Sequence, residues 1–469
     1  MNRQLFLILT GFSFILCSCS LAPEYNQPQA PIPNEWPRGA AYNTTKISPD
    51  AETVPELSRE SFFPDQQLQK IITMALEKNR DLRLAVLNVE RTRAMYGVQR
   101  AELFPAVDAS GIGGKRRLSS DLIGSGDSRT LEQYSVNLGI ASWEIDFFGR
   151  IRSLSEQALN AYLATEQAQR SAQIALVAEV ARVYLTLAKN QENLKLAQST
   201  LESQQGDYDL IKRRYEVGVG TELDLQRAQS RVDAAKRDIA GFIQQVAQDQ
   251  NALNLLAGSP VPETFLPADL SSIIPPKEIS PGLSSEVLLT RPDIIAAEYR
   301  LKGAYALIGA ARASFFPRIS LTTSIGTASG ELSGLFNSGT DIWNFAPQIV
   351  MPIFDARVWA ALRVSKADQK ILLTQYEKTI QVAFKEVADA LAVQGTIDQQ
   401  IAAQQSLVNA VAETFRLAGK RYMTGIDDYF GVLDAQRSLY AQQRVLIAFR
   451  LAKLVNRVNL YAVLGGGSD

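Results

Sequence analysis

The sequence contains no histidine and has only two cysteines among its 469 residues. Catalysis by a histidine base is therefore excluded, and so are zinc sites built from histidine and several cysteines. The sequence also lacks an excess of charge of either sign, because 48 Lys and Arg stand against 49 Asp and Glu. This balance argues against a nucleic-acid partner, which would require a basic excess. The length alone would allow two or three ordinary globular domains.

Both cysteines lie near the N-terminus, directly after an apolar run. This run, residues 5–16, is too short for a membrane-spanning helix of about 20 residues and is typical of a secretory signal or a short N-terminal anchor. The sequence LCSC at 16–19 resembles a bacterial lipobox. It predicts a lipoprotein signal peptide over 1–18 and a lipid such as palmitate on Cys19. Because Ser20 is not an inner-membrane retention signal of the Asp type, the outer membrane is favoured.

A proline-rich segment follows the cysteines and continues as polar sequence to about residue 60. Prolines exclude a regular helix and favour an extended chain; they stand at 23, 28, 31, 33 and 37. We therefore predict a lipidated N-terminal tether over 19–60. It could be a flexible stalk, but Tyr25 and Trp36 indicate that it lies on a protein surface.

The rest of the chain contains an internal duplication. RAELFP at 100–105 recurs as RASFFP at 312–317, and RRYEVG at 213–218 recurs as KRYMTG at 420–425. Markers that recur in the same order indicate two structural repeats.

A proline-rich stretch separates the two copies. It predicts a connector over 259–285, with structural repeat 1 over 61–258 and structural repeat 2 over 286–469.

Each copy contains a long stretch without proline that has apolar residues at helical spacing. The stretches 150–217 and 357–423 each predict one helix of about 100 Å at 1.5 Å per residue. Both stop at glycine, and second helices are predicted over 222–256 and 427–464. Each copy is thus predicted to form a long helical hairpin. A generic coiled coil remains an alternative for the hairpins alone.

The segments between the long helices are predicted to be strands and loops rather than helices. Their apolar residues alternate with small or polar ones, which is the period of a strand, over about 105–114, 132–148, 317–326 and 341–354. Trp143, Phe147 and Trp343 lie where an aromatic girdle would meet a membrane surface. The alternation fits a transmembrane strand, but it also fits a sheet packed on a soluble core.

Four strands cannot close a barrel, and open strand edges are not tolerated in lipid. Closure therefore requires an oligomer, and three chains would supply twelve strands. The predicted fold is mainly α with transmembrane β: each repeat supplies a helical hairpin and a two-stranded β-hairpin. The trimer would form a 12-stranded β-barrel and a long α-helical periplasmic tunnel.

Together with the lipobox and the duplicated motifs, LLTRPDI at 288–294 and LDAQ at 433–436 carry a family resemblance. The chain resembles the outer-membrane factors of the TolC/OprM type, in the lipoprotein (NodT-like) branch of tripartite efflux systems. The resemblance implies a homotrimeric exit channel in the outer membrane that conducts substrates passively. Its implied partners are a periplasmic adaptor (membrane fusion) protein, an inner-membrane transporter of the RND type and outer-membrane lipid.

The same resemblance implies that the chain is not an enzyme and needs no metal and no cofactor beyond the lipid on Cys19. The alternative class is a periplasmic adaptor or a structural coiled-coil lipoprotein. An adaptor would carry one hairpin within a lipoyl-like β domain rather than a duplicated hairpin with paired strands. A secreted hydrolase would need paired carboxylates in a cleft, whereas the acidic residues here are spread over helical faces.

The resemblance also places a gate where the hairpins turn, with a bracing contact between Tyr422 and Asp224. Implied gate residues are Asp427, Phe430, Asp434 and Arg437. Three symmetry-related copies of each carboxylate would attract cations near the axis, and Phe430 would add an apolar constriction. In the alternative, Asp434 and Arg437 form only a surface pair on one helix.

The expected crowding of Asp427, Asp428 and Asp224 predicts repulsion and a gate that is sensitive to pH and to divalent ions. Any lock would then rest on Tyr422, backbone groups or Arg437.

The turns themselves are predicted to dock the adaptor. The docking residues are Gly218, Val219, Gly220, Thr221, Thr424 and Gly425. A plain helical turn that requires glycine is compatible with this role.

Overall fold

The computed structural model describes residues 20–42, 58–119, 129–279 and 284–466. The predicted signal peptide and Cys19 lie outside these ranges. The chain forms two compact units. The first comprises the chain up to Gln29 with Asn88–Glu166 and Ala296–Tyr376, and the second comprises Ala30–Leu87, Gln167–Ile295 and Glu377–Asp469.

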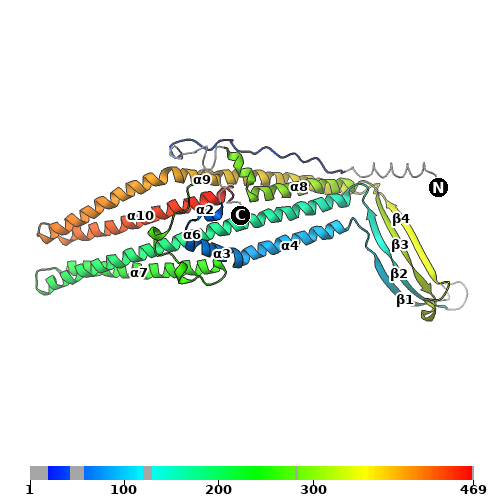
Figure 1. Ribbon diagram of the computed structural model, residues 1–469, viewed down its shortest axis with the longest axis horizontal. Coiled ribbons are helices and arrows are strands. Elements are labelled where there is room, and N and C mark those ends of the chain that lie inside the picture. The colour runs from blue at the N-terminus through cyan, green and yellow to red at the C-terminus, as the bar shows by residue number, and fades with distance from the viewer. Residues whose placement is uncertain (1–19, 43–57, 120–128, 280–283, 467–469) are drawn as a thin grey trace. The chain divides into compact units, whose positions relative to one another are not determined.

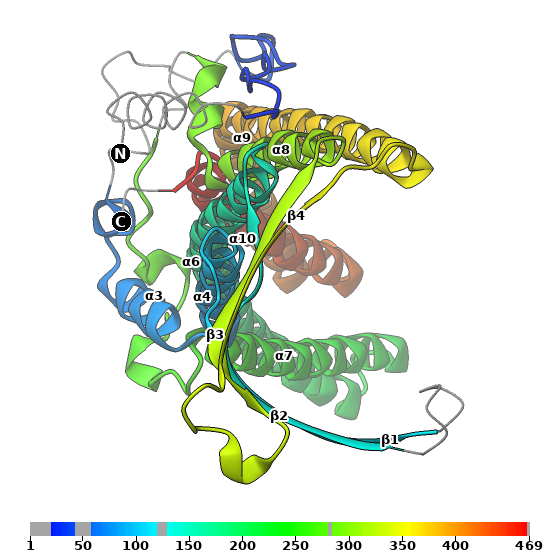
Figure 2. The same cartoon turned by 90° about the vertical axis from the view of Figure 1, so that its right-hand side faces the viewer.

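The first unit contains one antiparallel sheet whose strand order is β1-β2-β3-β4 (Figure 1). Its strands are β1 (Asp108–Leu118), β2 (Arg129–Ile145), β3 (Arg318–Ser329) and β4 (Asp341–Val350). Figure 2 shows the twist of these strands. The sheet does not close on itself within the chain, so β1 and β4 each have one edge without a neighbouring strand in the described sheet.

The strand register brings most of the apolar residues of the sheet onto one face, although Ile112 and Ile342 lie on the other. Leu138 pairs with Ile325, which in turn pairs with Trp343. One residue further along β2, Gly139 pairs with Ser324 on the opposite, polar face. The alternation predicted from the sequence is therefore confirmed, and it is shared by neighbouring strands.

Predicted and observed strand ends differ where proline and turns intervene. The first strand begins after Pro105 rather than at it, because Phe104 N donates to Ala101 O and prolongs the preceding helical turn. The last strand ends at Val350, since Pro352 has no N–H to continue a ladder. The two inner strands, predicted at 132–148 and 317–326, are observed at Arg129–Ile145 and Arg318–Ser329.

Two long helical hairpins follow the strand pairs (Figure 1). The first consists of α6 (Arg150–Glu216) and α7 (Glu222–Ala257), and the second of α9 (Ala356–Met423) and α10 (Tyr429–Val463). Helix α6 has 67 residues and is therefore about 100 Å long. The predicted hairpins are confirmed, including their turns at glycine.

Each strand pair is preceded by a shorter helix that the sequence reading missed. These helices are α4 (Arg80–Ala101) and α8 (Pro292–Ala313), and α2 (Arg59–Phe62) and α3 (Gln66–Lys78) lie further upstream. The prediction that strands and loops fill the segments between the long helices was therefore wrong for α8. Helix α8 is rich in alanine, so its faces differ little in hydrophobicity and its period is weak.

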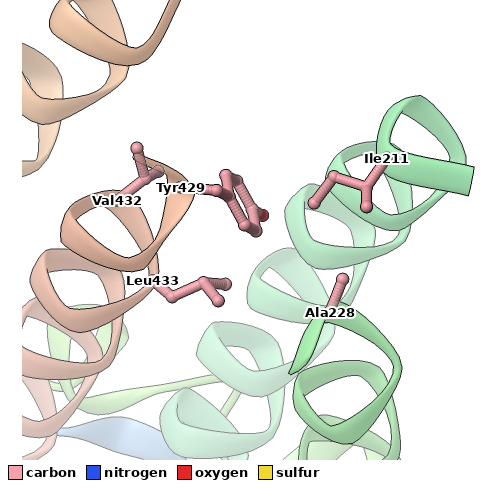
Figure 3. Close-up of a cluster of buried hydrophobic side chains, with 5 residues drawn as sticks. All are labelled: Ile211, Ala228, Tyr429, Val432 and Leu433. Carbon is pink, nitrogen blue, oxygen red and sulfur yellow. The ribbon is translucent and has the colours of Figure 1, made fainter. Parts of the chain in front are cut away.

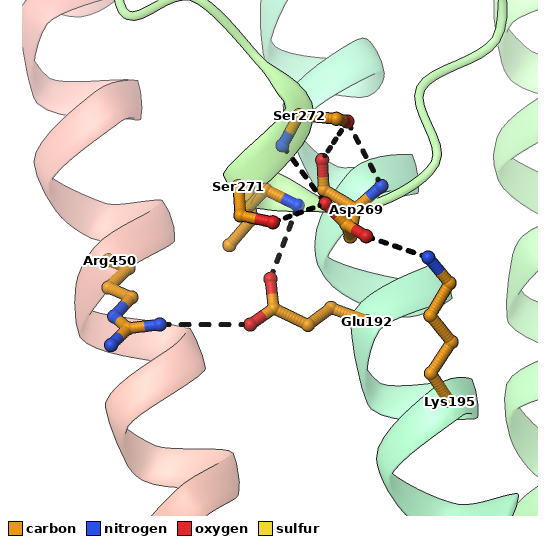
Figure 4. Close-up of polar contacts among 7 residues, drawn as sticks. Glu192, Lys195, Asp269, Ser271, Ser272 and Arg450 are labelled. Carbon is orange, nitrogen blue, oxygen red and sulfur yellow. Dashed lines mark hydrogen bonds and ion pairs between the residues drawn. The ribbon is translucent and has the colours of Figure 1, made fainter.

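The connector between the copies is fixed to the second unit by polar contacts (Figure 4). It includes the short 3₁₀ helices η2 (Glu263–Phe265) and η3 (Leu270–Ser272), and a third, η4 (Ser285–Thr290), begins where it ends. Asp269 caps η3 and accepts a hydrogen bond from Lys195 of α6 at 2.7 Å. Hydrogen bonds from this lysine, from the Ser271 hydroxyl and from the Ser272 backbone N–H hold the pKa of Asp269 at about 2. Glu192 accepts a bond from Leu270 N and lies 3.8 Å from Arg450 of α10.

Part of the N-terminal tether packs on the second unit. Trp36 is 5% exposed and stacks on Phe384 of α9, with ring centroids 5.4 Å apart. The Asn34 backbone oxygen accepts a hydrogen bond from Ser285 N. The expectation that the tether lies on a protein surface is confirmed at these residues.

Candidate gate at the helical tips

Both hairpins turn through the same backbone motif. Gly218 and Gly425 have φ of +79° and +72°, which a residue with a side chain rarely adopts. Val219 N bonds back to Arg214 O at 2.9 Å, and Ile426 N bonds back to Arg421 O at 2.9 Å. These bonds close a Schellman turn at the end of each long helix and satisfy its last carbonyls.

The second helix of each hairpin begins with a side-chain cap directly after its turn. Thr221 Oγ1 accepts from Asp224 N at 3.1 Å at the start of α7, and Asp428 Oδ1 accepts from Gly431 N at 3.4 Å at the start of α10. These caps bind the otherwise unsatisfied N–H groups of the first turn.

The predicted docking residues lie on the outside of these turns. Apart from the half-buried Gly220, all of them are exposed. Val219 and Ile426 follow the glycines at equivalent positions, and 66% and 63% of their surfaces are exposed. Val217 and Met423, on the other side of the glycines, are 73% and 72% exposed, so each tip presents at least two apolar side chains to its surroundings.

A hydrophobic cluster joins the two hairpins just above the tips (Figure 3). It contains Ile211 of α6 and Ala228 of α7 on one side, and Tyr429, Val432 and Leu433 of α10 on the other. The ring of Tyr429 points from α10 toward Ile211 in Figure 3. Burying these side chains stabilises the contact between hairpins by about 25 cal/mol for each Å² removed from water.

Two arginines of the first hairpin contact aromatic rings of the second. Arg214 Nη1 donates to the Tyr422 hydroxyl at 2.8 Å, and its guanidinium lies 5.2 Å from the centre of that ring. Arg227 lies 5.4 Å from the centre of the Phe430 ring. We call these two pairs the arginine–aromatic latch. Such contacts contribute about 0.5–1 kcal/mol each when exposed and more when desolvated.

The predicted brace between Tyr422 and Asp224 is not the contact that the structure shows. Tyr422 bonds to Arg214, whereas Asp224 accepts a hydrogen bond from Thr221 Oγ1 at 2.7 Å and lies 3.8 Å from Arg227. Asp224 sits in the first turn of α7, where its backbone N–H takes part in the cap. The cap therefore keeps its carboxylate on its own helix.

The prediction that acidic residues repel one another at the second tip is also corrected, because the structure pairs them with arginines. Arg421 forms two hydrogen bonds to Asp427, at 2.5 and 2.9 Å, across the Schellman turn. These bonds lower the pKa of Asp427. Asp434 pairs with Arg437 on the exposed surface of α10, which is the alternative that the sequence had left open. Both carboxylates are thus paired with arginines of their own hairpin.

Another carboxylate, which the sequence reading did not single out, lies between the hairpins. Asp207 of α6 is half-buried beside Tyr429 and Gln436 of α10, and burial raises its pKa. Burial is also the main cause of the raised pKa of Tyr429, followed by the charge of Asp207. The roles of Arg214 and Asp207 depend on which faces of α6 meet α9 and α10, and the sequence alone does not show this.

Replacing Asp207 by asparagine should strengthen the contact between α6 and α10 at neutral pH. Because the folded chain raises the pKa of this acid, stability falls as the pH rises above its ordinary value of 3.8. Asparagine carries no charge, so the substitution removes this loss of stability and its dependence on pH. Hydrogen exchange of the tip peptides at pH 7.5 should slow roughly two- to fivefold, a modest effect because the group is half-exposed.

Asp209 provides the matched control for this substitution. It lies two residues away on the exposed surface of α6, where it accepts a bond from Gln205 at 3.0 Å. Asp209→Asn should leave the exchange of the tip peptides unchanged. Equal slowing in both variants would contradict the role given to the buried carboxylate.

Within the described ranges, no group of three or more Cys, Asp or Glu residues is placed to hold a metal ion. The absence of a cofactor stays a prediction.

Two copies of a strand pair followed by a long helical hairpin, with most apolar residues of the sheet on one face, are typical of outer-membrane channel proteins with helical tunnels. The family described as "Outer membrane efflux protein" matches residues 71–259 and 283–466. The chain belongs to this family. The gap between the two matched segments falls within the proline-rich connector.

Named relatives span nearly the whole chain. This chain is 46% identical over 467 residues to the "Probable efflux pump outer membrane protein TtgC" of Pseudomonas putida. The match covers 98% of this chain and 95% of the relative. This chain is also 40% identical over 458 residues to "Outer membrane protein OprJ" of Pseudomonas aeruginosa, covering 97% and 94%.

Solved structures share the fold. The open-state MtrE outer membrane channel of Neisseria gonorrhoeae has a TM-score of 0.85 and 38% identity, covering 96% of this chain and 99% of that one. The chain is therefore an outer-membrane efflux channel, an exit duct without enzymatic activity that extends into the periplasm. The predicted fold class is confirmed, and the alternatives of an adaptor, a structural coiled coil or a hydrolase are excluded.

Proposed function

We propose that this channel is gated at the helical tips and works as the outer-membrane part of a tripartite pump with a periplasmic adaptor and an RND-type transporter. The observation that carries the proposal is the pair of equivalent glycine turns, each exposing apolar residues at the end of a hairpin. Apolar side chains that are grouped and exposed at the end of a hairpin are suited to a protein contact. Energy would come from the transporter, so the channel itself conducts passively.

Closure of the duct would depend on how the two hairpins of each chain are held together. The arginine–aromatic latch and the cluster around Tyr429 link the second hairpin to the first. Moving the second hairpin outward would break these contacts and widen the end of the tunnel. Asp427, Asp434 and Phe430 would line or flank the narrow end, with Arg421 and Arg437 offsetting the carboxylate charge.

Each chain would be held in the outer membrane by its own acylated N-terminus as well as by the barrel, so the trimer would have three lipid anchors. The lipobox at 16–19 supports a lipid on Cys19. Two or more acyl chains on one residue anchor a protein firmly, since each buried methylene contributes about 0.8 kcal/mol.

Crosslinking to the adaptor tests the docking surface. A thiol-reactive crosslinker attached at Thr221→Cys should join the channel to the adaptor in cells that express the whole pump. Thr414→Cys, which is exposed on α9 above the tip, provides the control and should crosslink far less. Equal yields at both positions would overturn the assignment of the turns as the docking site.

A further inference from the structure

A cavity of about 730 Å³ lies where the sheet joins the long helices. Its walls come from the ends of β2 and β4, the start of β3, the end of α8 and the first residues of α6 and α9. All of these residues belong to the first unit, and none of them belongs to the helical tips. The volume is within the range of small-molecule sites in proteins.

One wall of the cavity is the polar face of the sheet. Glu144 pairs with Ser320, which in turn pairs with Gln348, and all three line the cavity. Ser320 lies on the same face as Ser324, because alternate residues of a strand point to one side. In a transmembrane barrel with a water-filled channel, the polar face lines the lumen. This wall therefore faces the path of the cargo.

Glu144 is withdrawn into the wall and holds two arginines. Its side chain is 18% exposed and accepts two hydrogen bonds from Arg150, both at 2.8 Å. Arg318 Nε lies 3.3 Å from the same carboxylate, yet the Arg318 side chain is 58% exposed. One carboxylate thus serves two guanidinium groups, and the second of them stays open to a ligand.

The other carboxylates of the cavity are also less exposed than the arginines that they contact. Arg357 bonds to Asp355 at 2.8 Å, but its side chain is 91% exposed against 25% for the aspartate. Asp146 is 7% exposed and accepts a bond from Arg152 N at 2.8 Å. A ligand that enters the cavity therefore meets guanidinium groups rather than carboxylates.

Both long helices begin with an arginine where a helix favours negative charge. Arg150 is the first residue of α6 and Arg357 the second of α9, and neither helix has an acidic residue in its first turn. The N-terminus of a helix has a partial positive charge, so an anion is favourable there and a cation is not. Glu144 offsets Arg150, whereas the equivalent position of the second copy holds Met351. Positive charge is thus least compensated around Arg357.

Aromatic rings line the same cavity. Phe148 and Phe316 stack with their centroids 4.9 Å apart and an angle of 21° between their planes. The Phe316 side chain is also partly exposed. Such rings offer a large apolar surface to a ligand. The cavity therefore combines apolar surface with exposed guanidinium groups, which suits an anion that carries an apolar ring.

We propose that this cavity binds amphiphilic organic anions, as cargo that carries a carboxylate on an apolar ring. Arg318 and Arg357 attract the carboxylate, and Phe148 and Phe316 contact the ring. Guanidinium groups bind carboxylates through charge-assisted hydrogen bonds. A site on the wall of the lumen raises the local concentration of such cargo where the tunnel joins the barrel. The proposal rests on the function of the chain as an exit duct and not on the gate, the adaptor or the lipid.

Binding of para-fluorobenzoate to the purified trimer in detergent tests the proposal. A titration followed by fluorine NMR measures the dissociation constant without any current, so the state of the tips does not matter. Arg318→Gln and Arg357→Gln should each weaken binding about tenfold, because each removes a charged hydrogen-bond donor. Both variants should assemble, since Glu144 keeps Arg150 and Asp355 still accepts from the backbone N–H of position 357.

A third arginine and two further probes provide the controls. Arg363 is exposed on α9 and does not line the cavity, so Arg363→Gln should bind para-fluorobenzoate like the parent channel. Para-fluorobenzyl alcohol has the same ring without the charge, and fluoroacetate has the charge without the ring. Each of these two probes should bind the parent channel about tenfold more weakly than para-fluorobenzoate.

Four results would overturn the site. These are equal affinity of the parent channel and both cavity variants, and an equal loss of affinity in Arg363→Gln, which would indicate surface charge in general. The others are an alcohol that binds as tightly as the benzoate, which contradicts an anion site, and fluoroacetate that does so, which contradicts a role for the ring. Ion conductance of the parent trimer in planar bilayers reports the exit duct separately, so failure of the site and failure of the duct are distinguishable.

Discussion

Arg214→Ala should raise the conductance of the reconstituted channel several-fold. The substitution removes the hydrogen bond to Tyr422 and the cation–π contact with its ring. A hydrogen bond to a charged group contributes about 1.5–3 kcal/mol, and 1.4 kcal/mol changes an equilibrium tenfold. Because each chain of the trimer carries the contact, loosening three copies should favour the open tips strongly. Planar-bilayer recordings at fixed voltage and salt measure the change.

The neighbouring arginine is the control for this experiment. Arg213 has the same charge and lies in the same turn of α6, but its guanidinium donates to the Asp209 backbone oxygen of its own helix at 3.2 Å. Arg213→Ala should conduct like the parent channel. If both alanine variants conduct equally, the loss of positive charge and not the latch is responsible, and the proposed gate is wrong.

Gly326→Val should abolish the assembled channel. In β3, a Cβ at this position would lie 2.1 Å from the Val136 backbone oxygen and 2.8 Å from Asn137 Cα. Neither atom can move without breaking the pairing of β2 with β3. Overpacking costs about 1–3 kcal/mol or more at each site, so we expect at least a roughly tenfold loss of trimer on gels run without heating.

A second glycine in the same sheet distinguishes a steric clash at Gly326 from the general effect of placing valine on this face. Gly114 of β1 lies on the same polar face as Gly326, and a Cβ there would meet nothing within 4 Å. Gly114→Val should therefore assemble normally. Loss of the trimer in this variant as well would show that the polar face rejects larger side chains in general.

The sequence predicted the elements whose periodicity is strong and whose ends are marked. The long helices lack proline and end at Gly218 and Gly425, so both hairpins and their turns could be placed. The alternation in β2 and β3 was equally readable. Helix α8 was missed because its alanines give little contrast between faces, although Pro292 at its first position is a typical start.

The tip contacts could not be predicted because equivalent residues of the two copies have different roles. Arg214 and Arg421 occupy the same place in the duplicated motif. Arg214 reaches across to the second hairpin, whereas Arg421 closes onto Asp427 in its own turn. Gly220 occupies the place of Asp427 in the first copy, so Arg214 has no such partner within its turn. This choice depends on tertiary packing rather than on the motif.

Because β1 and β4 have unpaired edges, the amount of assembled channel depends on the concentration of free chains. A single chain cannot satisfy those backbone groups in a membrane, and exposed edges also invite incorrect association. If free chains equilibrate with trimers, the amount of channel rises with about the third power of their concentration. While most chains are unassembled, a cell that halves synthesis of this chain would then lose more than half of its efflux capacity, and the unassembled chains would be left to proteases.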